Sequence, residues 1–355
     1  QLGGAAGRFD DIGPALHPRV GADVNVQVYG TLNQPLDSAH RRSFLPGWCP
    51  GLNISRGRCC RLRPSCHASR PGSGKVLSGR PGWAGGPLWV LRFHGPGCPG
   101  DPVGEGNLSS LYRSGNNGET WKNISHISGL IWGNLFMHEG HLYLIGVSRQ
   151  FGNIVLRRSE DGGYTWTHPA DSKSGLLFVG GPGEQLPNYH GSAMPVLAHH
   201  GRLFTTFEDA RRPNTLLPGG DGARGVTGIQ AFVISVEEND DLLDASNWVM
   251  SNKLDLNADL APDAEGWPKL LDLNWREGAL VVAPDDELWS MMCVKGRPQV
   301  EKAAIVKVEE EGRRASFDPQ TGFIDFPGAM TKFIIRRDDS TGTYWTLSSP
   351  NINPS

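Results

Sequence analysis

IWGNLFMHEGHLYLIGVSRQFGNIVLRRSEDGGYTWTH, residues 131–168, is the stretch that decides the fold. It contains four short runs rich in β-branched and aromatic residues, separated by turn signals at Glu139-Gly140, Arg149–Gly152 and Ser159–Gly163. Runs of this length and spacing indicate strands of an antiparallel meander rather than helices. The four expected strands cover residues 132–137, 141–146, 153–157 and 165–167.

The loop at the end of this stretch has a pattern that occurs twice. Ser159–Trp166 (SEDGGYTW) fits Ser-x-Asp-x-Gly-x-Thr-Trp, and Ser114–Trp121 (SGNNGETW) repeats it with Asn116 in place of the Asp. A short Asx side chain can accept hydrogen bonds from the backbone of its own loop, Gly allows a positive φ, and Trp can fill the space under the turn. Both copies follow a predicted strand, which indicates a repeated structural unit.

The same alternation of strands and turns continues to the end of the chain, with first strands of successive units beginning near residues 132, 190, 277 and 332. Self-similarity of this kind is typical of a β-propeller. We predict an all-β fold, a β-propeller of four-stranded antiparallel blades with six or seven blades, whose last C-terminal strands lie beyond this sequence. The domain expectation is an N-terminal segment (1–45) that can supply a closing strand, an irregular insert or damaged blade (46–86), and the propeller (87–355).

The stretch from Ser38 to Gly100 differs from the rest of the chain. It contains no Asp or Glu, ten Arg or Lys residues, and five of the six cysteines. This composition allows a disulfide-stapled insert, a metal knuckle, a basic arm that binds polyanions, a disordered loop, or sequence that is not authentic coding sequence. Adjacent Cys59 and Cys60, without a paired Cys-x-x-Cys, argue against the metal knuckle.

Bulk properties restrict the partners. The net charge of −3 argues against a general nucleic-acid or membrane-surface binder, and the sequence has no run of 18 apolar residues. Asn-x-Ser sequons at Asn53, Asn107 and Asn123 slightly favour a secreted or extracellular protein. No cofactor and no metal site is predicted.

The propeller register brings a set of polar residues to one rim of the central channel. First strands present their entry residues there, and second strands end there. Catalytic candidates on this rim are His190, Glu208, Asp209 and Glu277, and candidate substrate contacts are Trp132, Asn134, Arg211, Trp275, Arg297 and Lys332.

Two of these segments allow specific roles. His190 can act as an acid or base near neutral pH, and Gly191 beside it allows a ligand to approach closely. Glu208 and Asp209 end an apolar strand, next to Arg211, which can clamp a carboxylate in bidentate fashion. The alternatives are a hydrogen-bonded core histidine and a structural ion pair across blades.

A second group surrounds Glu277, which follows Trp275, an aromatic ring suited to stacking on a sugar. Arg297 and Lys332 can neutralise the carboxylate of an acidic sugar, or balance the charges of Glu208 and Glu277. His199 and His200 lie at a predicted hairpin turn on the far edge and are expected to face solvent.

From about residue 88 to 349 the chain resembles the sialidase-like superfamily of Asp-box (BNR-repeat) β-propellers. The two loops above carry the resemblance, together with HGRLFTTFEDA (200–210), EKAAIVKV (301–308) and FIDFPGAMTKF (323–333). Related propellers include sialidases and polysaccharide lyases that act on uronates, among them rhamnose–glucuronate lyases. The Arg-Ile-Pro motif of true sialidases is absent, and Tyr189 and Tyr344 do not lie in a recognisable catalytic context.

The resemblance implies a carbohydrate-active enzyme that cleaves a glycosidic bond at an acidic sugar of an oligo- or polysaccharide. A sialidase-like glycoside hydrolase would use Glu208, Asp209 or Glu277 as acid and base.

Two alternatives stay open. A polysaccharide lyase would neutralise the uronate carboxylate with Arg297 or Arg211 and remove the C5 proton with His190. A non-catalytic propeller would bind the glycan without cleaving it.

Overall fold

The computed structural model describes residues 75–77, 87–94, 108–116, 118–182, 185–192, 194–216, 224–263, 266–338 and 341–348. The expected N-terminal segment and most of the 46–86 insert lie outside these residues. Strands dominate the described part of the chain, which has three short 3₁₀ turns as its helical elements. These are η3 (Ala245–Asn247), η4 (Ala258–Leu260) and η5 (Glu310–Gly312).

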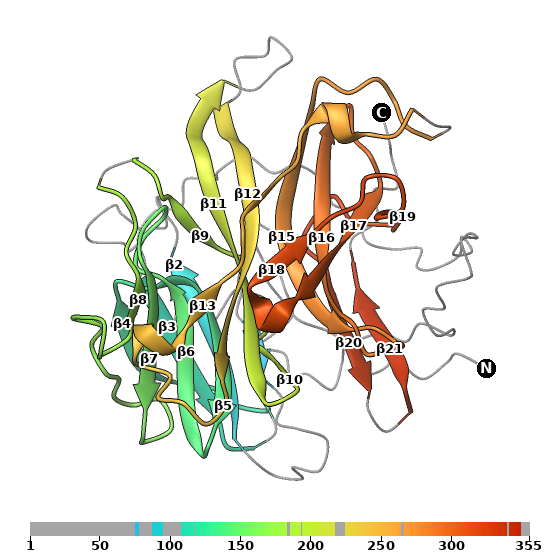
Figure 1. Cartoon of the computed structure of the whole chain (residues 1–355). Coiled ribbons are helices and arrows are strands. Elements are labelled where there is room, and N and C mark those ends of the chain that lie inside the picture. The colour runs from blue at the N-terminus through green and yellow to red at the C-terminus, as the bar shows by residue number, and fades with distance from the viewer. Residues whose placement is uncertain are drawn as a thin grey trace, which may run out of the picture.

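The strands form five antiparallel sheets that follow one another along the chain (Figure 1). The first contains β1 (Lys75–Leu77), β2 (Leu88–His94), β3 (Leu108–Ser114) and β4 (Lys122–Ser128). The second contains β5 (Ile131–His138), β6 (His141–Val147), β7 (Ile154–Ser159) and β8 (Leu176–Phe178). The third contains β9 (Tyr189–Gly191), β10 (Leu197–His199), β11 (Arg202–Leu216), β12 (Arg224–Glu237), β13 (Val249–Met250) and β14 (Leu254–Asp255). The fourth contains β15 (Asp272–Val282), β16 (Leu288–Arg297), β17 (Lys302–Glu309), β18 (Arg314–Ser316) and β19 (Phe323–Asp325), and the fifth contains β20 (Ile334–Asp338) and β21 (Thr343–Leu347).

The predicted all-β class is confirmed in this part of the chain, where the first two sheets have the predicted four antiparallel strands and the next three have six, five and two. The predicted first strands near 132, 190, 277 and 332 correspond to β5, β9, β15 and β20. The number of blades, closure of the ring and the strands beyond the sequence stay predictions. One predicted strand is wrong: residues 165–167 lie in a loop, and β8 is the fourth strand of its sheet. Asp161 holds Thr165 in the preceding turn, which keeps this run out of the ladder.

The two loops with the shared Ser–Trp pattern fold in the same way. Asp161 Oδ1 accepts hydrogen bonds from the backbone N–H of Thr165 (2.9 Å) and from the Ser159 hydroxyl (2.8 Å). Asn116 Oδ1 accepts the equivalent bonds from Thr120 N–H (3.0 Å) and the Ser114 hydroxyl (2.9 Å). The predicted Asx geometry is therefore confirmed in both loops, with Asp and Asn playing equivalent parts.

Apolar side chains fill the spaces between successive sheets. Between the second and third sheets, Phe136 and Tyr143 belong to the same buried cluster as Phe207, Phe232 and Trp248. Contacts between β5 and β9, β11 and β15, and β15 and β20 then bring the innermost strands of four sheets together. This packing decides which side chains can meet on the inner strands.

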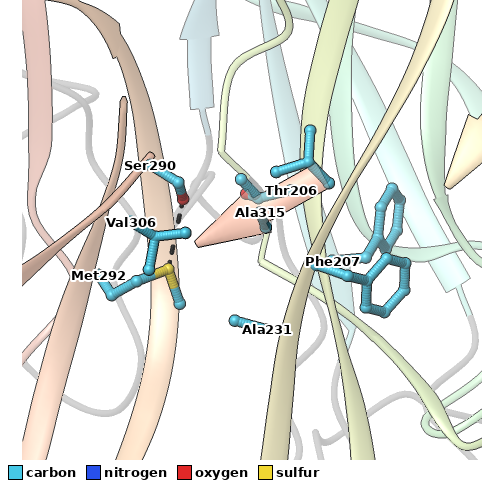
Figure 2. A pocket seen from close by; sticks show the side chains of 9 residues that line it. Thr206, Phe207, Ala231, Ser290, Met292, Val306 and Ala315 are labelled. Carbon is cyan, nitrogen blue, oxygen red and sulfur yellow. Dashed lines mark hydrogen bonds between the residues drawn. The ribbon is translucent and has the colours of Figure 1, made fainter. Parts of the chain in front are cut away.

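A small apolar cavity lies between the third and fourth sheets. Figure 2 shows Met292 and Val306 on one side of it and Ala231 on the other, with the Phe207 ring turned away. At about 10 Å³ it has room for about one water molecule. It is therefore a packing gap between sheets and not a substrate site. No helix among the described residues is long and apolar enough to cross a bilayer.

Candidate functional site

Five partly or fully buried side chains meet where the inner strands approach one another. We call them the Trp132 cluster, and they are Trp132 from β5, His190 from β9, Glu208 from β11, Glu277 from β15 and Lys332 just before β20. The Trp132 ring lies 5.5 Å from the His190 ring, between centroids, and its centroid lies 5.5 Å from Lys332 Nζ. Trp132 therefore lies next to one member of each of two pairs, His190–Glu208 and Glu277–Lys332.

The first pair consists of His190 and Glu208. The two residues are directly opposite each other in the β9–β11 ladder, and His190 Nδ1 lies 3.2 Å from Glu208 Oε2. The Glu208 side chain is 3% exposed, whereas the His190 side chain is 17% exposed. Within the described residues, Glu208 Oε1 has no hydrogen-bond partner. A buried carboxylate oxygen in this state is costly unless a ligand or water satisfies it.

The second ion pair joins Glu277 and Lys332, with 3.4 Å between Oε1 and Nζ. Burial raises the pKa of Glu277, but the charges of Lys332, His190 and Arg276 outweigh it and leave the pKa below its ordinary value. Glu277 is therefore an anion at neutral pH. Since its side chain is 21% exposed, the carboxylate can reach a ligand.

Backbone irregularities aim two of these side chains. The β5–β6 register shifts between Ile131 and Asn134, and Trp132 there has φ +50°. The β15–β16 register shifts between Arg276 and Gly278, which makes Glu277 the extra residue of a β-bulge. Bulges redirect side chains and are common beside active sites, and a bulky residue at positive φ is a costly conformation that also occurs there.

Gly191 has a different role from the one predicted. A Cβ on Gly191 would lie 2.8 Å from the Trp132 carbonyl oxygen and 2.9 Å from Trp132 Cβ. Glycine is required because the backbone of β9 packs directly on the bulge of β5. Gly191 therefore makes room for Trp132 within the protein.

Two predicted residues on β11 point away from the cluster. Asp209 is buried on the opposite face from Glu208, where Oδ2 lies 2.5 Å from Lys253 Nζ and Oδ1 accepts a hydrogen bond from Asn188 N–H. Arg211 shares that face and lies 3.3 Å from Asp255 at the surface. Successive residues of a strand alternate between faces, so the predicted catalytic Asp209 and carboxylate-binding Arg211 are corrected to structural ion pairs.

Two further substrate contacts are corrected to structural residues. Trp275 is completely buried, donates a hydrogen bond to the Leu254 carbonyl (2.9 Å) and meets Phe317 edge-on, so its ring cannot stack on a sugar. Asn134 is 3% exposed and donates a hydrogen bond to the Met194 carbonyl (2.6 Å).

Arg297 belongs to a basic group beside the cluster. It is opposite Asp272 in the β15–β16 ladder, with Lys295 two residues away along β16. Burial, followed by the positive charges of Arg276 and Arg297, lowers the pKa of Lys295. Burial raises the pKa of Asp272, and the same cations oppose that shift. The contact between Arg297 and substrate stays a prediction.

Some neighbours of the cluster were not predicted from the sequence. Trp132 Nε1 donates a hydrogen bond to Gln150 Oε1 (2.7 Å), and the Phe93 and Phe151 rings lie 5.9 Å from Trp132 and 6.1 Å from His190. Phe93 is near the end of β2, and the other two follow β6. The rule that second strands end at the pocket rim could therefore have predicted these three residues.

Comparisons with known proteins give structural similarity alone. No family model matches the sequence, and no curated protein does. An α-L-arabinofuranosidase from Lactobacillus brevis has a TM-score of 0.40 and 13% identity, over 79% of this chain and 75% of that one. An α-L-arabinanase from Penicillium chrysogenum has a TM-score of 0.41 and 17% identity, over 74% of this chain and 72% of that one. A Dyadobacter fermentans protein of unknown function has a TM-score of 0.44 and 13% identity, over 75% of this chain and 72% of that one. At these values the similarity says nothing about substrate or reaction, which depend on the chain's own side chains.

Proposed function

We propose that the protein is a carbohydrate-active enzyme that hydrolyses a glycosidic bond at the Trp132 cluster. The observation that supports this function is the approach of an anionic carboxylate, Glu277, to His190, an imidazole paired with a second carboxylate, Glu208. Glycoside hydrolysis needs one group that donates a proton and one anion that acts as base or nucleophile. Glu277 suits the role of the anion, and His190 suits that of the proton donor.

Glu277 is the proposed anion. Its lowered pKa keeps it charged, so it can attack the anomeric carbon or take a proton from the attacking water. Lys332 holds the carboxylate in place from 3.4 Å away. The distance available between this carboxylate and the proton donor decides whether the configuration of the sugar is retained or inverted.

His190 is the proposed proton donor, because it is the more exposed member of its pair. The protonated imidazole gives its proton to the glycosidic oxygen as that bond breaks, and the leaving sugar departs as an alcohol. Glu208, whose side chain is nearly inaccessible to solvent, orients the imidazole and stabilises its charged form. Trp132 offers an aromatic surface next to both groups on which a sugar ring can stack.

The substrate class that fits best is an acidic sugar. Lys332 is part of the cluster, and Arg276 and Lys295 interact electrostatically with Glu277. Cations around the reacting centre would stabilise a substrate carboxylate.

Incubation with a panel of acidic oligosaccharides in heavy-oxygen water tests this proposal. Hydrolysis places one heavy oxygen in the released sugar, as seen by mass spectrometry. Glu277→Gln should abolish the release, whereas Arg211→Ala, outside the cluster, should preserve it. No cleavage across the panel, with binding retained, would overturn the enzymatic proposal in favour of a glycan-binding protein.

The His190–Glu208 pair also supports a second candidate, a uronate lyase. An unprotonated His190 oriented by Glu208 could remove the C5 proton while Lys332 neutralises the uronate carboxylate. The lyase product would be lighter by one water, would absorb in the near ultraviolet and would carry no heavy oxygen. The same experiment therefore separates the two reactions.

A further inference from the structure

Two hairpin turns of neighbouring sheets bring two imidazoles and a carboxylate together. His199 ends β10, His200 is in the β10–β11 turn, and Asp286 is in the β15–β16 turn. One potential ligand atom from each of the three side chains lies within 4.8 Å of the other two. His200 lies in the turn before β11, and Glu208 is six residues after Arg202, the first residue of β11, which corresponds to about 20 Å of strand. This histidine group is therefore separate from the Trp132 cluster.

The group lies in a concave part of the surface. The concavity has a volume of about 390 Å³ and is lined mainly by charged side chains. Five glutamates contribute to its lining, namely Glu237, Glu287, Glu309, Glu310 and Glu311. Arg202 pairs with Glu237, and Lys307 pairs with Glu287 at 2.8 Å. Arg313 and Arg314, outside the lining, pair with the last three glutamates. Since the six acidic side chains of the lining still outnumber these four basic ones, the groove favours a cation.

We propose that His199, His200 and Asp286 bind a divalent transition-metal ion of the Zn²⁺ type. Imidazole nitrogen and carboxylate oxygen are ordinary ligands of Zn²⁺, and three protein ligands leave a fourth position for water or a groove carboxylate. A calcium-type site would instead need six to eight oxygen ligands, which two imidazoles do not provide.

The geometry requires only a small adjustment. Ligands about 2 Å from Zn²⁺ lie about 3.3 Å apart in a tetrahedral site. His200 Nε2 and Asp286 Oδ2 are already 2.9 Å apart, and the two imidazole rings are stacked with centroids 3.8 Å apart. The His200 and Asp286 side chains are 71% and 64% exposed, so they can rotate toward an ion without disturbing the core.

Binding of the ion would tie the β10–β11 turn to the β15–β16 turn, and hence the third sheet to the fourth.

Titration of the metal-free protein with Zn²⁺ by calorimetry, and with Co²⁺ by absorption spectroscopy, tests the proposal. We expect one Zn²⁺ ion bound per protein chain. We also expect a rise in Tm on addition of Zn²⁺, since a ligand that binds the folded state stabilises it. His200→Asn and Asp286→Asn should each weaken binding at least tenfold. Asn suits both positions because His200 and Asp286 have φ of +48° and +71°, which Asn tolerates well.

His141→Asn is the matched control, because His141 begins β6 directly after the hairpin turn of another sheet. Its Zn²⁺ affinity should equal that of the wild type. Tm values measured without metal verify that each variant is folded. If the wild type binds no Zn²⁺, or binds it as tightly as folded His200→Asn and Asp286→Asn do, the proposal is wrong. A Co²⁺ spectrum without nitrogen ligation would also overturn it.

Discussion

Glu208 and Asp209 are adjacent carboxylates on β11, equally buried at 2% and 3% exposure, but the two faces of the strand treat them differently. Asp209 is fully supported: one oxygen meets Lys253 Nζ at 2.5 Å and the other accepts a backbone hydrogen bond from Asn188. Glu208 has one partner, His190, and an oxygen that no described residue satisfies. A buried carboxylate with every hydrogen-bond partner in place stabilises a fold, whereas one with an unsatisfied oxygen is suited to a ligand.

The surroundings of Asp209 reinforce this difference. Lys253 Nζ, its partner, also lies 5.1 Å from the Tyr189 ring centroid and 5.4 Å from that of Phe232. Burial, followed by the charge of Asp209, raises the pKa of Tyr189 to about 12. This tyrosine therefore stays neutral at all ordinary pH values. The face of Asp209 is a closed structural network.

The largest expected effect is on the stability contributed by Asp209. Asp209→Ala leaves the Lys253 ammonium and the Asn188 N–H without their partner, and breaking a buried ion pair in this way costs about 3 kcal/mol. The free energy of unfolding in urea measures the loss. Arg211→Ala is the control on the same face, where the exposed pair with Asp255 is worth less than about 1 kcal/mol. If Asp209→Ala and Arg211→Ala lose equal amounts of unfolding free energy, the buried pair of Asp209 is not a special stabilising feature of this face.

The next effect is on activity and concerns Glu208. Glu208→Gln keeps the size of the side chain but removes the charge that orients His190, so we expect kcat to fall about 100-fold with KM nearly unchanged. The free energy of unfolding should change by less than about 1 kcal/mol. A general structural role would instead lower stability and raise KM. This variant therefore separates a positioning residue from a second structural carboxylate.

The sequence predicted the meander, the first strands and the two Asx loops because these depend on local patterns. It also identified the five members of the Trp132 cluster as rim residues. It did not separate Glu208 from Asp209, because strand alternation says that they face opposite ways but not which of them faces inward. That choice depends on pairing between β9 and β11, a tertiary contact that brings His190 opposite Glu208.

Trp275 and Glu277 show why the rest could not be predicted. The two residues have the same parity, so strict alternation places them on one face of β15. The bulge between Arg276 and Gly278 shifts the parity, which sends Trp275 into the core and Glu277 toward Lys332. Gly278 is the one local signal, because an isolated glycine inside a strand often marks a bulge, but it does not say which neighbour becomes the extra residue. The position of Glu277 in the site therefore depends on a β-bulge, which strict alternation of residues along a strand does not predict.

The smallest expected effect extends the comparison to an exposed carboxylate. Hydrogen bonds from the backbone and side chain of Thr165 lower the pKa of Asp161 to about 2, from an ordinary 3.8. Because the pKa is lowered on folding, the stability that Asp161 contributes is complete above about pH 4 and is lost as the pH falls from 3.8 toward 2. Solvent screens this exposed group, so we expect only a few tenths of a kcal/mol.

Asn116 occupies the same place in the other loop and supplies a natural reference, because its amide does not titrate. Asp161→Asn should give a loop with the hydrogen bonds of Asn116 and a slightly weaker pH dependence of the unfolding free energy between pH 2 and 4. Asn116→Asp should have the opposite effect and strengthen that dependence. Urea denaturation at several pH values measures both changes. If neither substitution alters the pH dependence of the unfolding free energy, the charge of Asp161 does not stabilise the fold. A carboxylate with all its hydrogen-bond partners then need not contribute through its charge.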